Sequence, residues 1–245
     1  MKIKKLTIFS LVVFMLMSLI LTSCGGTEEV NFTADNYLQG QMPKKGDEIA
    51  IIKTNMGEMK VMLFPKYAPK AVENFTTLAK EGKYDGIIFH RVVNDFMIQT
   101  GITNDGTVSK WGSSFEIETT DMLHHFKGAL SMANTGRANS NSSQFFIVQR
   151  GPVSDQYIQY FQNNNYINND EVAKVYKSVG GTPDLDGGIT GLNAGYTVFG
   201  HVFEGLDVVD AIAGVDLVYS EMYGDTVLPA EDVIIETIEI TTYEG

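Results

Sequence analysis

The sequence has almost no cysteine: Cys24 is the only one among 245 residues. A single thiol excludes an intramolecular disulfide and any metal site built from several cysteines. The four histidines do not supply a metal site either. His124 and His125 are adjacent, so they diverge on a regular element, and no third ligand lies at metal spacing. We therefore expect neither a metal ion nor another cofactor.

Positive charge is also scarce. Lysine and arginine number 18 against 30 aspartates and glutamates, which gives a formal net charge of −12. A chain with this charge is a poor partner for nucleic acid. The sequence contains no glycine-rich phosphate loop, zinc signature, nucleophile elbow or assembled hydrolytic triad. These absences argue against nucleotide-dependent, zinc-dependent and serine-dependent enzymes.

The N-terminus carries a targeting pattern. Three lysines in "MKIKK" precede an apolar run over residues 6–21, and small residues follow in "LTSCGG". This order predicts a secretory signal over residues 1–23 that is removed on maturation. The ending "LTSC" resembles the lipobox of bacterial lipoproteins, which makes Cys24 the lipid-modified first residue of an extracytoplasmic protein held at the cell membrane by acyl chains. The alternatives are an uncleaved transmembrane anchor and a plain signal peptide.

Residues 24–46 follow the predicted lipidation site. They are polar, contain glycine and show no sustained period of 2 or 3.6. This composition predicts a flexible tether that holds the next domain off the membrane. The alternative is an ordered arm, because four larger apolar side chains could dock on the domain: Phe32, Tyr37, Leu38 and Met42.

From residue 47 onwards the pattern is that of a β-rich domain. "EIAIIKTNMGEMKVMLF" predicts two strands joined by a tight turn at 55–57, and "PKAVENFTTLAKEG" predicts a helix between Pro69 and Gly82. Further strand-like runs are "GIIFHRVV", "FKGALSMAN", "QFFIVQ", "YTVFGHV" and "DVIIETIEITTY", with a short helix at "GLDVVDAIAG". Many short strands with glycine turns and few helices predict a closed or sandwiched β fold.

Several blocks of this region occur in an order that resembles one known family. "IIFHRVVNDFMIQTG", "GALSMANTG", "SSQFFIVQ" and "YTVFGHVFEGLDVVDAI" follow a hairpin and "APKAVENF", and are similar to the cyclophilin-type peptidyl-prolyl cis/trans isomerases. The resemblance covers residues 47–245 and is interrupted once. It implies a mainly β fold, namely a closed eight-stranded antiparallel β-barrel capped by two helices, and an activity on X-Pro peptide bonds.

Within "FHRVVNDFMIQTG" an arginine stands among large apolar residues. On a strand, Phe89, Arg91 and Val93 share a face, so Arg91 is either a surface residue or a charge held in an apolar wall. Rotation about an X-Pro bond meets a barrier of about 18–20 kcal/mol, and the proline nitrogen regains a lone pair at the twisted midpoint. A fixed donor aimed at that nitrogen stabilises the transition state more than either planar state. Arginine suits this role because it stays protonated and donates in several directions.

The resemblance assigns the other site residues one at a time. Gln99 matches the glutamine that orients the arginine, Gln144 matches a neighbouring polar contact, and His90 has a structural place. The alternative for Gln99 and Gln144 is that they only satisfy buried backbone groups, and the alternative for the aromatic and methionine residues of the pocket is ordinary core packing. The remaining matches are Phe96 and Met97 on the apolar floor, Phe146 on the aromatic wall, Ala133 and Asn134 on the edge that pairs with the peptide, and Tyr196 where many members have histidine.

One feature of the family is missing. Many cyclophilins have a ligand-contacting tryptophan just before Leu-Asp-Gly, whereas the single tryptophan here, Trp111, lies in "KWGSSFEIE". "PDLDGG" offers Asp184 followed by Leu185, and "GLNAGYTVFG" offers Gly191 followed by Leu192. The distance to "YTVFG" favours the second candidate, which makes Leu192 the substrate-binding residue. Neither position is aromatic, so we expect weak affinity for the cyclic peptide cyclosporin.

Residues 150–195 interrupt the resemblance, between "FFIVQ" and "YTVFG", where the family usually has a much shorter connection. "DQYIQYFQ" and "NDEVAKVYKSVGG" have apolar residues at roughly helical spacing, and Gly180 and Gly181 provide a stop. The sequence thus predicts a partly helical insertion near the mouth of the groove. It either shapes the choice of client or is a neutral surface excursion.

These patterns predict a membrane-anchored, monomeric isomerase that acts on proline-containing segments of exported or unfolded proteins. The alternative, from another functional class, is a cyclophilin-shaped binding module that holds clients or a partner with little turnover. The retained pocket residues favour the enzyme, whereas the missing tryptophan and the insertion are compatible with the binding module.

Overall fold

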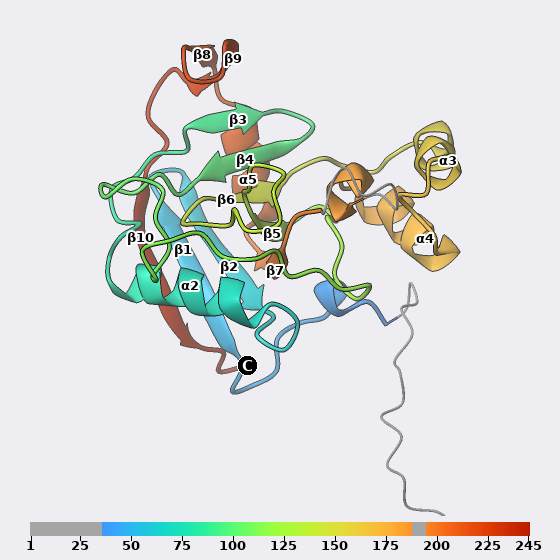
Figure 1. Ribbon diagram of the computed structural model, residues 1–245, viewed down its shortest axis with the longest axis horizontal. Helices are drawn as coiled ribbons and strands as arrows, with labels where there is room; N and C mark the ends of the chain where they lie inside the picture. The colour runs from blue at the N-terminus through green and yellow to red at the C-terminus, as the bar shows by residue number, and fades with distance from the viewer. Residues whose placement is uncertain (1–35, 188–194) are drawn as a thin grey trace, which may run out of the picture. The chain divides into compact units, whose positions relative to one another are not determined.

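The fold is built on one curled antiparallel sheet, seen in a computed structural model that describes residues 36–187 and 195–245 (Figure 1). The strands of this sheet lie in the order β10-β1-β2-β7-β5-β6-β4-β3. Their bounds are β1 Glu48–Thr54, β2 Gly57–Leu63, β3 Arg91–Val93, β4 Met97–Thr100, β5 Ala129–Met132, β6 Phe145–Val148, β7 Val198–Glu204 and β10 Ile235–Thr242. The mainly β character and the eight strands agree with the expectation from the sequence.

The expected closure of this sheet is wrong. The edge strands β3 and β10 share no ladder in the described part of the chain, so the sheet is a half-barrel rather than a closed barrel. The segments that precede them meet at a bridge between Ile88 and Ile234, and the Phe89 N–H donates to the Val233 carbonyl at 2.9 Å. The strand β3 begins only at Arg91, beyond the bridge between Ile88 and Ile234. Its residues therefore do not pair with β10.

Two helices cover the sheet, as the resemblance implied: α2 (Pro69–Lys80) and α5 (Leu206–Ala213). Pro69 opens α2, where its fixed φ suits the first turn. The Phe75 ring lies 5.3 Å from the rings of Phe145 on β6 and Phe199 on β7. Burying one such side chain contributes about 1.5–3 kcal/mol, so α2 is held firmly against strands that also carry the site. The buried residues of α2 include the predicted apolar set Ala71, Val72, Phe75, Leu78 and Ala79.

A hairpin that the sequence analysis did not predict lies beside β3 (Figure 1). It consists of β8 (Leu217–Ser220) and β9 (Asp225–Pro229), which pair with each other and not with the main sheet. Its turn carries Tyr223, which is half-buried. The hairpin therefore brings a residue from far along the chain to the β3 edge.

The insertion is helical, as predicted, over α3 (Asp155–Asn163) and α4 (Asp170–Val179), and continues into a 3-10 turn, η2 (Pro183–Asp186). The side chains of Ser154 and Asn169 cap the two helices by accepting a backbone N–H of the first turn. The two helices lie side by side (Figure 1) and share a small apolar core with Phe126, whose ring lies 4.6 Å from that of Tyr176. The insertion thus has its own core and is anchored to the segment before β5.

The chain before β1 packs on the domain from residue 36 onwards. It contains a short 3-10 turn, η1 (Leu38–Gly40), and Gln39 is only 2% exposed. The Gln39 side chain accepts the His124 N–H at 2.8 Å and donates to the His124 carbonyl at 2.7 Å, while Tyr37 lies edge-on to Phe126. Around Tyr37 and Gln39 the chain before β1 therefore contacts the domain, whereas Met42 is 57% exposed. The division of residues 24–46 between tether and arm stays a prediction.

The predicted signal segment, Cys24 and Phe32 lie outside the described residues, so the signal peptide, the lipidation site and the first half of the tether remain predictions. Within the described ranges, no helix combines the length and the apolar character needed to cross a membrane.

Candidate active site

Arg91 lies at the first position of β3, directly opposite Gln99 on β4. Its Nη1 donates to the Gln99 Oε1 at 3.3 Å and lies 3.9 Å from the Met97 sulfur. The guanidinium carbon is 5.8 Å from the centre of the Phe96 ring and 5.6 Å from that of Tyr223. The half-buried guanidinium is therefore held between two aromatic rings by contacts that suit a cation.

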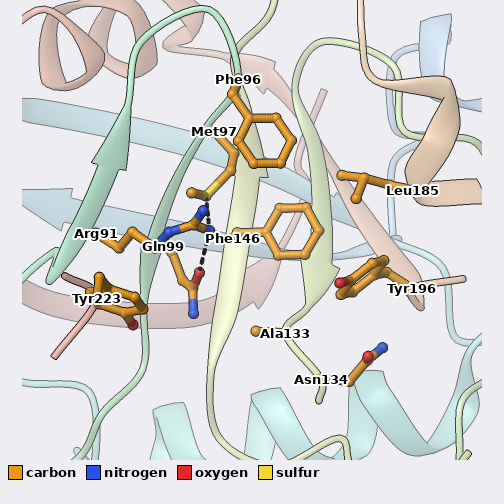
Figure 2. A pocket seen from close by; sticks show the side chains of 10 residues that line it. All are labelled: Arg91, Phe96, Met97, Gln99, Ala133, Asn134, Phe146, Leu185, Tyr196 and Tyr223. Carbon is orange, nitrogen blue, oxygen red and sulfur yellow. Dashed lines mark hydrogen bonds between the residues drawn. The ribbon is translucent and has the colours of Figure 1, made fainter. Parts of the chain in front are cut away.

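A cavity of about 220 Å³ opens beside this guanidinium (Figure 2). Figure 2 shows Arg91 and Gln99 pointing toward each other, with Phe96, Met97 and Phe146 along one side and Leu185 and Tyr196 on the other. The lining residues are Arg91, Phe96, Met97, Gln99, Ala133, Asn134, Phe146, Leu185, Tyr196 and Tyr223. The structure thus brings together most of the residues that the sequence singled out, from β3, β4, β6, the end of β5 and the start of β7.

Gln144 contributes to the site through its contact with Gln99. The Gln99 Nε2 donates to the Gln144 Oε1 at 2.9 Å, so the glutamine that receives the Arg91 hydrogen bond is itself oriented. The Gln144 carbonyl accepts the Ala133 N–H at 2.9 Å, which ties this pair to the rim of the cavity. A guanidinium positioned by two successive hydrogen bonds has its direction set before any ligand arrives.

The cavity offers one charge in an apolar surrounding. Arg91 is the only charged side chain among its lining residues in the described part of the chain. The nearby His90 is buried and stacks on Tyr223, and burial lowers the pKa of its imidazole to about 4, so it is neutral near pH 7. Such a site favours a neutral, partly apolar ligand on which a partial charge or a lone pair develops during the reaction. It is less suited to a reaction that transfers a proton.

Comparison with known proteins decides the family. A family model described as cyclophilin type peptidyl-prolyl cis-trans isomerase/CLD matches residues 49–240. The chain is a member of the cyclophilin family. It is therefore a peptidyl-prolyl cis/trans isomerase of the cyclophilin type, as the sequence motifs indicated.

Relatives of this cyclophilin are found among bacteria. A candidate peptidyl-prolyl cis-trans isomerase of Staphylococcus haemolyticus is 42% identical over 209 residues, which cover 84% of this chain and 98% of the relative. A candidate bifunctional phosphatase/peptidyl-prolyl cis-trans isomerase of Streptococcus pyogenes is 46% identical over 194 residues. That match covers 77% of this chain and 38% of the streptococcal protein, so this chain corresponds to only part of it.

Solved structures support the same family. The crystal structure of a Cryptosporidium parvum cyclophilin type peptidyl-prolyl cis-trans isomerase, determined in the presence of the dipeptide Ala-Pro, matches with a TM-score of 0.57 and 26% identity. The match covers 80% of this chain and 99% of that structure. The fold of the cyclophilin described above is thus shared almost over the whole length of that relative.

Two residues of the cavity in this cyclophilin, Leu185 and Tyr223, were not among the predicted site residues. Leu185 belongs to "PDLDGG", the less favoured of the two candidate segments, whereas Leu192 lies outside the described residues. The assignment of Leu192 therefore stays a prediction. Tyr223 had no usable signal beyond the glycine turn of "MYGD", since its approach to Arg91 depends on where the β8–β9 hairpin folds back.

A buried network supports the aromatic wall from behind. The His125 ring stacks on Phe146 with centroids 6.0 Å apart, and its Nδ1 lies 2.7 Å from an oxygen of Asp186 at the end of η2. The other Asp186 oxygen is 2.8 Å from the His124 Nδ1 and accepts the Tyr176 hydroxyl at 2.6 Å. The two histidines were expected to diverge, but residues 123–125 form no regular element, so both reach one carboxylate.

The electrostatics of this network keep Asp186 charged. Burial alone would raise the pKa of its carboxyl, but His124 and His125 outweigh burial and hold that pKa well below the usual value. Burial alone would lower the pKa of His124, but Asp186 outweighs burial and raises it. No group of three or more histidine, cysteine or acidic residues within the described ranges is arranged to hold a metal. The network therefore connects the insertion to the wall of the cavity through the contacts of Asp186 with His124 and His125.

Proposed function

We propose that this cyclophilin isomerises X-Pro bonds of exported proteins at the outer face of the cell membrane, with Arg91 as the group that stabilises the twisted amide. The observation that carries the proposal is the placement of Arg91, which Gln99 orients at the edge of an apolar cavity. The cyclophilin crystallised in the presence of Ala-Pro supports a proline-containing ligand.

The apolar floor accounts for proline binding in this proposal. Met97 and Phe146 are buried beneath the cavity, and Phe96 and Tyr196 border it. A pyrrolidine ring has no N–H to satisfy, so it enters such a surface without losing a hydrogen bond. The backbone on either side of the proline would then lie along the rim at Ala133, at the end of β5, in the manner of an added strand.

Arg91 accounts for catalysis. In the planar amide the proline nitrogen shares its lone pair with the carbonyl, and the lone pair returns to the nitrogen when the bond is twisted. A guanidinium N–H at that nitrogen is a stronger interaction in the twisted state than in either ground state, which is the requirement for acceleration. The aromatic rings of Phe96 and Tyr223 exclude water around the donor and strengthen this effect.

The cellular location in this proposal rests on the sequence. The basic start, the apolar run and "LTSC" support export followed by lipidation at Cys24. Cell fractionation of the wild type and of a Cys24→Ser variant tests this part: we expect the wild type in the membrane fraction and the variant in the soluble extracytoplasmic fraction. Equal distribution of the two would refute lipid anchoring.

The mechanism is tested by NMR exchange spectroscopy on a short X-Pro peptide with the purified full chain. Removing one preorganised donor typically costs about 10²–10³-fold in rate, so Arg91→Ala should lose most of the acceleration. Lys53→Ala is the control, because Lys53 lies on β1 and does not line the cavity. A wild type that binds the peptide without accelerating its exchange would instead support the binding module.

A further inference from the structure

A second cavity of about 380 Å³ lies next to the first, and Phe96 lines both. Its walls come from the β3–β4 turn, from α3 and from the residues around η2. Tyr157 and Phe161 of α3 give it an aromatic side, and Thr182, Asp184 and Arg150 give it polar groups. The insertion therefore builds most of this cavity.

The two cavities are neighbours along η2 as well as across Phe96. Asp184 lines the second cavity, whereas the next residue, Leu185, lines the first. Because Asp184 and Leu185 are consecutive, their Cα atoms are about 3.8 Å apart. A bound peptide therefore needs only a few extended residues to reach from one cavity to the other. A peptide whose proline lies beside Arg91 can therefore place a neighbouring side chain in the second cavity.

The positive charge of Arg150 in this cavity is already engaged. Its Nε donates to the Asp95 carbonyl at 2.7 Å and lies 3.7 Å from the Asp95 carboxylate. Its guanidinium lies over the Tyr157 ring, with 5.2 Å to the ring centroid, and donates to the Tyr157 hydroxyl. An acidic ligand would have to compete with these contacts, so the cavity is not arranged to capture an anion.

Asp184, in contrast, has an available negative charge. It forms no salt bridge with any described residue, although it is only partly exposed. Burial raises the pKa of its carboxyl, and a hydrogen bond from its own backbone N–H and the attraction of Arg150 offset this only in part. A partly buried carboxylate of this kind gains energy from a cation that enters the cavity.

Thr182 supplies a second group that lacks a partner. Thr182 is 1% exposed, and its hydroxyl oxygen has no hydrogen-bond partner among the described residues. A buried hydroxyl without a partner costs about 1–3 kcal/mol, so such a group in a native protein calls for an explanation. A donor that enters the cavity beside Asp184 would supply the missing bond.

We propose that the second cavity is a basic-residue subsite, which binds the lysine or arginine side chain of the same peptide whose proline occupies the first cavity. The aliphatic stem lies against Phe96, Tyr157 and Phe161, and the cationic end reaches Asp184 and Thr182. This inference rests on the proposed binding of X-Pro peptides and adds a preference for a basic residue near the proline.

The test uses a set of otherwise neutral peptides in which one lysine stands, in turn, at each of the three positions before and after the proline. Norleucine peptides serve as the uncharged match and glutamate peptides as the opposite charge, and both Kd and kcat/KM are measured with the full chain. A charged hydrogen bond in a partly buried site predicts a preference for lysine over norleucine of about 10-fold at one position. This ratio should fall as salt is added, because salt screens the partly exposed pair.

Three variants decide whether the second cavity causes the preference. Asp184→Asn should bring the lysine-to-norleucine ratio close to one, and Thr182→Val should lower it. Asp155→Asn should leave it unchanged, because Asp155 carries the same charge on the same insertion but pairs with Lys177 and does not line the cavity. If Asp184→Asn fails to give a folded spectrum, the isosteric Thr182→Val variant decides.

The outcomes separate this inference from the proposed function. Equal Kd values for lysine and norleucine at every position, a preference for glutamate, or a lysine preference that survives in Asp184→Asn would overturn the subsite. Rapid exchange without a lysine preference leaves the isomerase mechanism intact and removes only the subsite. Binding with a lysine preference that depends on Asp184, but without faster exchange, leaves the subsite and removes the catalytic proposal.

Discussion

Arg91 and Gln99 face each other across the β3–β4 ladder, with the Arg91 Nη1 3.3 Å from the Gln99 Oε1. Residues that pair directly across two antiparallel strands keep their side chains on the same face of the sheet. Gln144 extends this relationship by accepting from the Gln99 Nε2 at 2.9 Å. The orientation of the arginine is therefore a property of the sheet register.

Gln99→Met should weaken catalysis without unfolding the protein, because methionine has a similar length but cannot accept the Arg91 hydrogen bond. Losing one hydrogen bond to a charged group predicts a decrease in kcat/KM of about 10-fold, measured by NMR exchange on an X-Pro peptide. Gln156→Met is the control, since Gln156 is exposed on α3 and does not line the cavity. Wild-type kcat/KM in Gln99→Met would contradict the orienting role.

Tyr223→Leu should also lower kcat/KM, because it removes the aromatic ring whose centre lies 5.6 Å from the Arg91 guanidinium. A cation–π contact at a partly exposed position predicts a loss of about 2- to 5-fold. Tyr223→Phe keeps the ring and should retain most of the rate, and Met222→Ala on the same exposed turn serves as a control. An equal loss in the phenylalanine and leucine variants would assign the effect to the hydroxyl instead.

Cyclosporin should bind this cyclophilin weakly, with no submicromolar Kd, because the family's ligand-contacting tryptophan is absent. Since Leu185 lies in the cavity wall, we expect the preceding residue, Asp184, to occupy the tryptophan position. Asp184→Trp should tighten binding by about 10-fold or more, as a buried aromatic anchor does at interfaces. Gly191→Trp, at the other candidate position, should leave the Kd unchanged, and calorimetric titration of both variants distinguishes the two positions.

His201 should make the protein less stable in mild acid. Burial lowers the pKa of its imidazole to about 3, and its Nδ1 lies 3.3 Å from the Gln39 Nε2. Below its ordinary pKa of 6.5 the unfolded chain takes up a proton that the folded protein does not, so stability falls as the pH drops from 6.5 toward 3. Each unit of pH in this window costs about 1.4 kcal/mol from this residue.

His201→Gln tests this prediction because glutamine accepts a hydrogen bond but does not titrate. Urea unfolding at pH 6.5 and pH 4.5 should show that the wild type loses about 2–3 kcal/mol more than the variant over this interval. His124, whose pKa is raised, contributes stability below pH 6.5 that is lost as the pH rises, but it is present in both proteins and cancels in the difference. The same pH dependence in both would contradict the prediction.

Sequence reasoning was accurate where structure is local. The spacing of Ala71, Val72, Phe75 and Leu78 predicted a helix that the structure shows at Pro69–Lys80, and the insertion forms helices where apolar residues recur at helical intervals. The cavity residues Arg91, Phe96, Met97 and Gln99 come from one hairpin, whose geometry follows from strand alternation. For these elements the interacting residues lie within about ten positions of one another.

Long-range contacts were predicted poorly. Closure of the sheet depends on how far β3 and β10 overlap, which their composition does not reveal. Tyr223 reaches Arg91 through a hairpin, and Gln39 meets His124 from the chain before β1, both without any periodic signal. Asp186 gathers two histidines that sequence spacing alone suggested would point apart.

By itself the sequence determined the strands of the main sheet, the helices, the family and the side chains of the β3–β4 hairpin around Arg91, because these follow from short-range periodicity and from the order of motifs. Only the tertiary structure decided the open edge of the half-barrel, the contacts of Tyr37 and Gln39 with the domain, and the second cavity lined by the insertion. The physical reason is that these features arise where loops bring distant segments together, and loop paths depend on packing rather than on local preference.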